Sequence, residues 1–402
     1  MRRPHRWRTI ASAAAALALA TMLGAGTAQA AQQSSGQRIT SLASSTTSVR
    51  QEAPSSAALK LRPLEDSCSS VEANLAAYAK AGRTQVECLT PLQASNSASR
   101  VAGAPAPSVG TLQLPSWCTV SDEWLGDRTE MCLMDGATVT NIDTETGEPL
   151  GTATFQVNQL INFAWNSLNF TENYEFVVTE VTGSMAGTGA NLTVTCTLKT
   201  TCLDIGGFED VPLVEGTDEV TTLQGSDTTS SVDTNSISYT LSWDPITLTS
   251  TQYTSPDFRC DSNVAVSGSA GCIVPGFTPD VDMSSLPDIT QNILAVWAKS
   301  TMEYGNYGLG NPLTRDTALR AANRAVACPS SVTSQAPSGT SCDEYPFART
   351  DQGASQVPAS EWGYAFVPTA EQQQQAQILA NFVQQNRIMD GTGNGDAYWV
   401  VP

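Results

Sequence analysis

Apolar and polar residues alternate with a period of two through much of the segment between residues 112 and 279. The alternating apolar positions of two such runs, "NLTVTCTLK" and "SISYTLSW", are Leu192, Val194, Cys196, Leu198, Ile237, Tyr239, Leu241 and Trp243. Strict alternation is typical of strands that bury one face, and turn-forming stretches such as "TETGEP" and "GTGAN" separate the runs. We therefore predict an antiparallel, sandwich-like β-domain over residues 111–285, large enough for a core of its own.

One turn in this domain is acidic. "DTETGEP" contains Asp143, Glu145 and Glu148, so a calcium-binding loop is one interpretation. The stretch lacks the full set of regularly spaced ligands that such loops use, and a Gly among polar residues between two alternating runs is typical of a hairpin. A hairpin turn is the interpretation that we favour.

The regions on either side have different patterns. Residues 31–110 are expected to form a flexible leader and a linker, interrupted by a small helical segment between Cys68 and Cys88. Residues 286–402 begin with a helical pattern and continue with "EWGYAFV" as a strand, "TAEQQQQAQILANFVQQN" as a helix and "AYWVV" as a strand. The expected fold class is multi-domain, a β-rich, sandwich-like N-terminal region followed by a small α+β domain at the C-terminus.

The first thirty residues have the pattern of a signal peptide. A basic stretch, "MRRPHRWR", precedes a short apolar segment rich in Ala and Gly, and "AQA" offers a cleavage site after Ala30. We expect residues 1–30 to be removed and the mature protein to be secreted. No later segment is long and apolar enough to predict a membrane span.

The cysteines agree with an oxidising compartment. Ten of them follow the expected cleavage site: Cys68, Cys88, Cys118, Cys132, Cys196, Cys202, Cys260, Cys272, Cys328 and Cys342. An even number in an exported chain predicts disulfide bonds. Sequence alone leaves the connectivity open, but the cysteines occur in neighbouring couples, so sequential pairing is the simplest hypothesis. No C-x-x-C spacing is present, which argues against a thiolate zinc site.

Charge and histidine content narrow the chemistry. The chain has 20 Lys and Arg against 39 Asp and Glu, a formal net charge of −19 at pH 7, which favours solubility over general attraction to phosphates. Its one histidine, His5, lies in the expected signal peptide. Imidazole-based catalysis in the mature chain is therefore excluded, and any active site must use carboxylates, amides, hydroxyls, Lys, Arg or a metal.

The stretch "SCDEYPFART" places two adjacent acids, Asp343 and Glu344, next to Cys342. A solvated surface turn is one interpretation, and a metal-dependent active site is the other. If the stretch is a strand, the two side chains point to opposite faces, so one of them at most faces a given ligand directly.

The order of motifs near the C-terminus resembles a known domain. "NPLTR", "ANRAVAC", "CDEYPFARTDQGA", "FVPTAEQ", "NRIMDG" and "DAYWV" are similar to the secreted NucA/NucB-type deoxyribonuclease domain, over about residues 308–402. The β-rich region resembles N-terminal segments of exported actinobacterial proteins that carry this domain, and that likeness implies no activity. The resemblance implies a small ββα-metal nuclease with one divalent cation, Mg²⁺ or Mn²⁺, that works without histidine.

The resemblance also suggests site residues. Glu344 is expected to be the base or to position water, with Asp343 at the same catalytic site as a metal ligand or as a partner that supports a ligand, and the two assignments could be swapped. Glu371, Gln372 and Asn381 match positions near the metal. The alternative for Glu371 is a structural one, in which "TAEQ" forms a capping box with Thr369 as N-cap.

Three further positions have alternatives. Asn381 also fits a solvated polar stripe on its helix, and Arg349 and Arg387 either bind DNA phosphates or solubilise the surface. Gln372 replaces the Asn that the family commonly has, which moves the amide by about 1.5 Å at a site that tolerates little displacement.

These expectations combine into one hypothesis about function. We expect a secreted, metal-dependent endodeoxyribonuclease that hydrolyses DNA phosphodiester bonds without sequence specificity, and that is monomeric. The partner of the β-domain is left unknown. The alternative is a catalytically degenerate nuclease fold in an extracellular binding or surface protein.

Overall fold

A computed structural model describes residues 67–92, 111–119, 123–198, 200–203, 206–244, 250–263, 268–391 and 395–402. The expected signal peptide, most of the leader and the linker lie outside the described residues. None of the helices in the described ranges is both long and apolar enough to cross a membrane.

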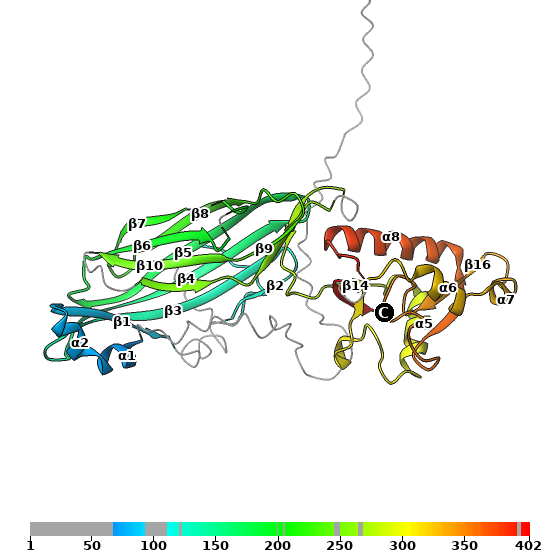
Figure 1. Ribbon diagram of the computed structural model, residues 1–402, viewed down its shortest axis with the longest axis horizontal. Coiled ribbons are helices and arrows are strands. Elements are labelled where there is room, and N and C mark those ends of the chain that lie inside the picture. The colour runs from blue at the N-terminus through cyan, green and yellow to red at the C-terminus, as the bar shows by residue number, and fades with distance from the viewer. Residues whose placement is uncertain are drawn as a thin grey trace, which may run out of the picture. The chain divides into compact units, whose positions relative to one another are not determined.

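The largest element is an antiparallel sheet of long strands (Figure 1). Its strands follow the order β1-β3-β4-β5-β8, with β2 paired to β3. Their bounds are β1 (Gln85–Pro91), β2 (Leu125–Gly126), β3 (Glu130–Asp143), β4 (Pro149–Ala164), β5 (Ser167–Gly183) and β8 (Asp218–Ser226). Burial alternates along most of β4, as a period-two pattern of apolar and polar residues predicts.

A second antiparallel sheet packs against the first. Its order is β11-β10-β6-β7, with bounds β6 (Gly189–Cys196), β7 (Gly206–Pro212), β10 (Ile237–Asp244) and β11 (Ser250–Thr254). Aromatic rings join the two layers, since Phe155 lies 5.3 Å and Phe176 6.4 Å from Trp243 between ring centroids. One continuous apolar core fills the space between the sheets, so the sandwich-like prediction is confirmed.

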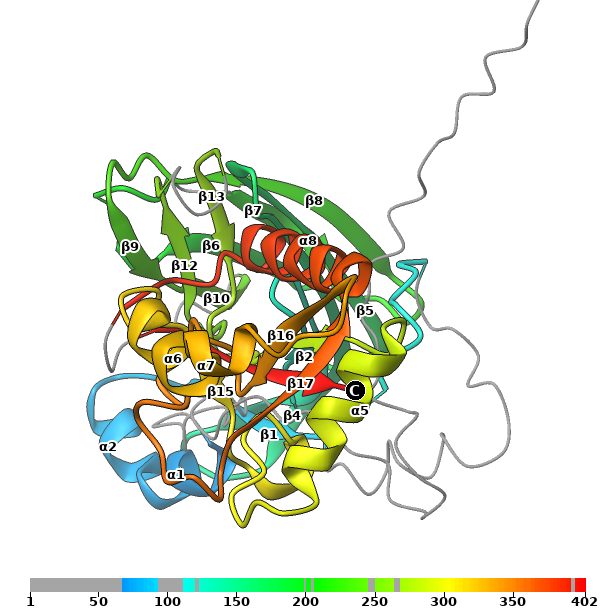
Figure 2. The same ribbon diagram turned by 90° about the vertical axis from the view of Figure 1, so that its right-hand side faces the viewer.

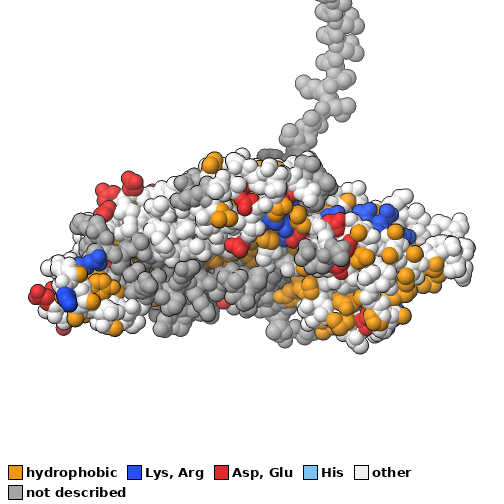
Figure 3. All heavy atoms as spheres, in the orientation of Figure 1, with side chains coloured by type: hydrophobic (Ala, Val, Ile, Leu, Met, Phe, Trp, Pro, Cys, Tyr) orange, Lys and Arg blue, Asp and Glu red, His pale blue; other side chains and the backbone are white. Residues whose placement is uncertain are grey.

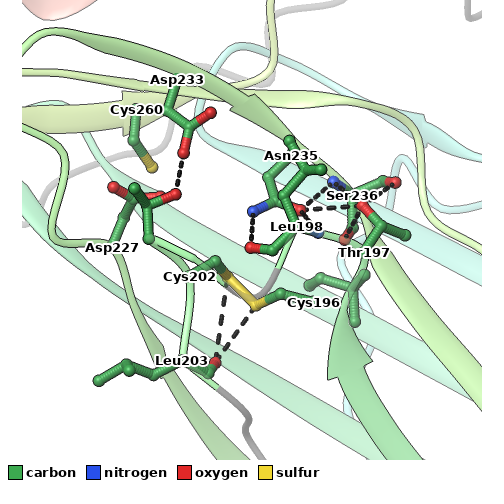
Figure 4. The surroundings of a disulfide bond; sticks show 12 residues. Cys196, Thr197, Leu198, Cys202, Leu203, Asp227, Asp233, Asn235, Ser236 and Cys260 are labelled. Atoms are coloured by element: carbon green, nitrogen blue, oxygen red, sulfur yellow. Dashed lines mark hydrogen bonds between the residues drawn. A yellow bond between two sulfur atoms is a disulfide. The ribbon is translucent and has the colours of Figure 1, made fainter.

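A small third sheet extends this domain. It has the order β13-β12-β9, with bounds β9 (Val232–Asn235), β12 (Phe258–Asp261) and β13 (Gly271–Ile273). Figure 4 shows the neighbouring Cys196–Cys202 disulfide, with Asn235 beside it. Asn235 donates to Leu198 O and accepts from the Leu198 N–H and the Thr197 hydroxyl, which ties this sheet to the end of β6.

The disulfide bonds follow the simplest hypothesis. All five are sequential pairs: Cys68–Cys88, Cys118–Cys132, Cys196–Cys202, Cys260–Cys272 and Cys328–Cys342.

The acidic turn at Asp143 also has the predicted form, because it joins β3 to β4 and Asp143 accepts the Glu145 and Thr146 N–H groups. The helical segment before it is two short helices, α1 (Cys68–Ala73) and α2 (Leu75–Lys80), that precede β1.

The C-terminal domain has its own core, which begins at Val281. Its helices are α5 (Pro287–Trp297), α6 (Arg320–Ala327), α7 (Ser330–Thr333), α8 (Thr369–Gln385) and the 3₁₀ turn η1 (Tyr307–Leu309). Its strands are β14 (Asp280–Asp282), β15 (Leu313–Thr314), β16 (Thr340–Tyr345), β17 (Gly363–Pro368) and β18 (Ala397–Val401). The predicted boundary at residue 285 therefore falls within this domain, because β14 pairs with β18.

Two sheets organise the C-terminal domain. One has the order β14-β18-β15, and the other is the antiparallel hairpin β16–β17. The long helix α8 follows the hairpin directly in sequence, and α5 and α8 both lie against it (Figure 2). The hairpin followed by a helix is the ββα arrangement that the resemblance implied.

Candidate active site

The two adjacent acids lie in the middle of the hairpin. In β16, Asp343 is opposite Ala365 of β17, and Glu344 is opposite Tyr364. Both side chains are buried, with exposed fractions of 2 % for Asp343 and 5 % for Glu344. Because successive residues of a strand face opposite sides, as predicted, the two carboxylates have separate surroundings.

Asp343 is surrounded by amide side chains. Asn292 of α5 donates its Nδ2–H to Asp343 Oδ2 at 2.9 Å and to the Asp343 carbonyl at 3.1 Å. Gln372 of α8 donates from Nε2 to Asp343 Oδ1 at 3.1 Å. Burial raises the pKa of Asp343 above its usual value, and the two amides act in the opposite direction. The carboxylate is therefore held in place by uncharged donors from two helices.

Gln375 completes this amide group one turn further along α8. It is buried, and its Oε1 accepts from Gln372 Nε2 at 3.0 Å. Among the described residues its Nε2 has no hydrogen-bond partner within the usual distance, although it is close enough to Asp343 to favour the ionised carboxylate and lower its pKa. Three amide side chains therefore surround the Asp343 carboxylate.

Glu344 faces a cation instead. Arg324 of α6 donates from Nη1 to both carboxylate oxygens of Glu344, at 2.9 and 3.1 Å. Burial raises the pKa of Glu344 to about 7, while Arg324 lowers it and the charge of Asp343 raises it further. A carboxyl group with a pKa near neutrality can accept a proton under ordinary conditions, as a general base must.

A disulfide and a buried amide fix α6 beside the hairpin. Cys328, at the end of α6, is bonded to Cys342, two residues before Glu344. Asn323 is completely buried and donates to the carbonyls of Ala348 and Thr350, so it also anchors the loop after β16. These two restraints set the position of Arg324, which lies between them on the same helix.

Glu371, which was predicted to lie near a metal, has other partners. Glu371 accepts the N–H groups of Asp288 and Ile289 with Oε2, at 3.0 and 3.3 Å, and so caps the start of α5. The capping box does not form, because Thr369 is the first residue of α8 and its hydroxyl donates to the Gly339 carbonyl.

Asn381 lies away from the acids. It is exposed and accepts from Gln377 at 2.8 Å. It comes nine residues after Gln372, which corresponds to about 13 Å along an α-helix. Of the suggested ligands, the structure brings Asp343 and Gln372 together and leaves Asn381 on the solvated stripe of α8.

The two arginines suggested for phosphate binding differ sharply. Arg349 is exposed, whereas Arg387 is completely buried. Arg387 donates from Nε to Asp261 Oδ2 at 2.9 Å and from Nη2 to the Asp261 carbonyl at 3.0 Å. A guanidinium enclosed in this way stabilises the fold and offers nothing to a phosphate, so we do not carry Arg387 into the proposed site.

Sequence reasoning missed three contributors, Asn292, Gln375 and Arg324. Arg324 was open to prediction: it is four residues before Cys328, whose bond to Cys342 brings it near Glu344. No local signal marks Asn292, since it reaches Asp343 from 51 residues away in the chain.

The residues around Asp343 are compatible with a divalent cation. Mg²⁺ and Mn²⁺ prefer oxygen ligands and often use one or two carboxylates with water and phosphate oxygens. Asp343 supplies a carboxylate of this kind, and the Gln372 and Gln375 side chains beside it also carry amide oxygens. In this structure Gln372 Oε1 accepts from the Ser341 hydroxyl, and Gln375 Oε1 accepts from Gln372 Nε2. Among the described residues, however, no three Asp, Glu, His or Cys groups gather closely enough to hold a metal by themselves.

Comparison with known proteins supports the C-terminal assignment. No curated protein and no solved structure matches the chain. The family model described as "Deoxyribonuclease NucA/NucB" matches residues 306–398, which includes the hairpin, α6 and α8. The chain therefore carries, at its C-terminus, a domain of the NucA/NucB deoxyribonuclease family.

Proposed function

We propose that this protein is a metal-dependent endonuclease that hydrolyses DNA phosphodiester bonds through Glu344 and Asp343. The observation that carries the proposal is the placement of Glu344 within the family match. It is a buried carboxylate with its pKa raised to about 7, held by Arg324. Hydrolysis needs a group that removes a proton from water, and Glu344 has suitable chemistry.

Asp343 has the complementary role in this proposal. With the amide groups around it, Asp343 would hold one Mg²⁺ or Mn²⁺ on the α5 and α8 side of the hairpin, the face opposite Glu344, where a bound cation would stabilise negative charge. Asn292 and Gln372 orient the Asp343 carboxylate from two helices. Gln372 belongs to this set in place of the Asn that the family commonly has.

Secretion and lack of sequence specificity are part of the same proposal. Five disulfide bonds are typical of a protein that folds outside the reducing cytoplasm. A nuclease without base-reading side chains depends on phosphate contacts, so its activity should be salt-dependent. Extracellular DNA is the substrate that fits both features.

Plasmid degradation by the purified full-length mature protein tests the proposal. The reactions contain EDTA, Mg²⁺ or Mn²⁺, and compare wild type with Glu344→Gln, Asp343→Asn and the control Glu148→Gln, which changes an exposed acid in the β-domain. We expect cutting only with a divalent cation, loss of cutting in both site variants, and unchanged cutting in the control. Cutting by Glu344→Gln at the wild-type rate would refute the role of Glu344.

A second candidate is a degenerate nuclease fold that binds DNA without cutting it. The observation in its favour is that Gln372 directs its amide nitrogen, not its oxygen, at Asp343. Well-folded wild type that binds DNA but fails to cut it with either cation would support this candidate.

A further inference from the structure

Helix α6 presents two arginines, Arg320 and Arg324, on the side of the hairpin where Glu344 lies. The residues are one helical turn apart, so both side chains extend from the same face. Both guanidinium groups are near enough to Glu344 for their positive charges to favour its ionised form and lower its pKa. The sequence reasoning did not single out either residue as a ligand-binding group.

Arg324 reaches from the buried carboxylate to the surface. Its side chain is 39 % exposed, whereas that of Glu344 is 5 % exposed. Nη1 makes both bonds to Glu344, and Nη2 has only a long contact of 3.4 Å with the Cys342 carbonyl. A guanidinium group has five N–H donors, so part of this one remains available to an external acceptor.

Arg320 is more available still. It is exposed, and within the described ranges it forms no ion pair. Two other arginines of the domain are engaged: Arg315 donates to the Ile388 carbonyl at 2.6 Å, and Arg387 is enclosed by its bonds to Asp261. Arg349 is exposed like Arg320, but it lies in the loop after β16 and not on α6. Figure 3 shows Lys and Arg side chains gathered on the C-terminal domain near α8, with Asp and Glu side chains beside them.

The spacing of the pair suits a nucleic acid strand. Four residues of α-helix rise about 6 Å. Successive phosphates of one DNA strand advance about 3.4 Å along the axis, so two neighbouring phosphates fall within reach of two long side chains. The helix itself is held by Asn323 and by the Cys328–Cys342 bond, so the two guanidinium groups project from a fixed base.

We propose that Arg320 and Arg324 bind two successive phosphates of the DNA strand that enters the site. Arg324 contacts a phosphate and Glu344 together, and so sets the distance between the substrate backbone and the carboxylate. The proposal rests on the proposed function for the identity of the substrate, and it does not require turnover.

The test measures binding of a fluorescein-labelled DNA duplex to the full-length mature protein by anisotropy. EDTA is present to prevent cutting, and the salt concentration is varied. The variants are Arg320→Gln, Arg324→Gln and Arg324→Lys, and the matched control is Lys80→Gln, which removes one exposed positive charge from α2. The melting temperature of each variant shows that it is folded.

Log affinity falls with log salt, and we expect this negative slope to become shallower by about 0.9 in each Arg→Gln variant. Each lost phosphate contact releases one counterion fewer. Arg324→Lys should restore most of the slope, and Lys80→Gln should keep the wild-type value. Unchanged slopes in both Arg→Gln variants, or wild type that shows no salt-dependent binding, would overturn the inference. Wild type that binds as expected but never cuts DNA would instead refute the proposed catalytic function alone.

Discussion

Two buried glutamates, one from each domain, can be compared directly. Glu172, in the β-sandwich, is completely buried and accepts from Gln159 Nε2 at 2.9 Å and from the Tyr239 hydroxyl at 3.0 Å. Glu344, in the C-terminal hairpin, is nearly as buried but is bonded to Arg324. Burial raises the pKa of both carboxyl groups, to about 8 and about 7.

The comparison shows that a raised pKa does not by itself mark an active site. Glu172 has neutral partners and lies between two sheets, so its proton has no route to a substrate. Glu344 has a partner whose side chain is 39 % exposed, which connects the carboxylate to the surface. A charged partner and access to solvent are the features on which the proposed role of Glu344 depends, and Glu172 has neither.

The largest expected effect separates the two glutamates by activity. Glu344→Gln should lower the rate of DNA cleavage by about 10²–10⁴-fold, the usual contribution of a general base. Glu172→Gln keeps the hydrogen-bonding shape without a titratable proton and should leave the rate within about threefold. Initial rates of plasmid cleavage with Mg²⁺ or Mn²⁺ measure both, and equal losses would remove the distinction.

The next effect concerns the cations that pair with buried acids. Asp261→Asn should lower the free energy of unfolding by about 3–5 kcal/mol, because it leaves the buried Arg387 without its counter-charge. Arg324→Gln should cost about 1 kcal/mol, since its side chain is partly exposed and Glu344 can take up a proton. Urea unfolding at pH 7 compares the two, and a larger cost for Arg324→Gln would contradict this ranking.

A third prediction uses the pH dependence of stability. The pKa of Glu172 is about 8 in the folded protein against an ordinary 4.5, so the folded state holds this proton more tightly. Its contribution is fully present below pH 4.5 and is lost as the pH rises through 8, at up to about 1.4 kcal/mol per pH unit. Urea unfolding of wild type should show this decline across the window, and Glu172→Gln should show a shallower one. Parallel profiles would mean that Glu172 does not titrate as described.

The smallest effect is expected at the edge of the same network. The Tyr253 hydroxyl donates to Tyr174 Oη at 2.9 Å and contacts Gln159 Oε1 at 3.3 Å. Tyr253→Phe keeps the ring and removes these bonds, so it should cost about 1 kcal/mol and leave cleavage unchanged. A thermal melt and one cleavage assay are sufficient, and a loss of cleavage would show that the two domains are coupled.

Local patterns predicted the features that depend on neighbouring residues. The alternation in "SISYTLSW" gave β10, the couples of cysteines gave the five disulfide bonds, and adjacency gave the opposite orientations of Asp343 and Glu344. These features follow from side-chain periodicity or from short loops, which a sequence shows directly.

Features that depend on distant residues were not predictable in the same way. Arg387 looked like a surface cation, but its partner Asp261 is 126 residues away. Glu371 looked like a cap of its own helix, and it caps α5 because the two helices meet in space. Burial and pairing of polar groups are set by tertiary packing, for which one sequence contains no direct signal.

The alternation along β16 makes strand register decisive for chemistry. If β16 slipped by one residue against β17, every side chain would exchange faces. Glu344 would then lie among the amides of α5 and α8, and Asp343, shorter by one methylene, would face Arg324. The Cys328–Cys342 bond opposes such a slip, because Cys342 shares a face with Glu344 and is tied to the end of α6. A structural cross-link thereby determines which acid meets which partner.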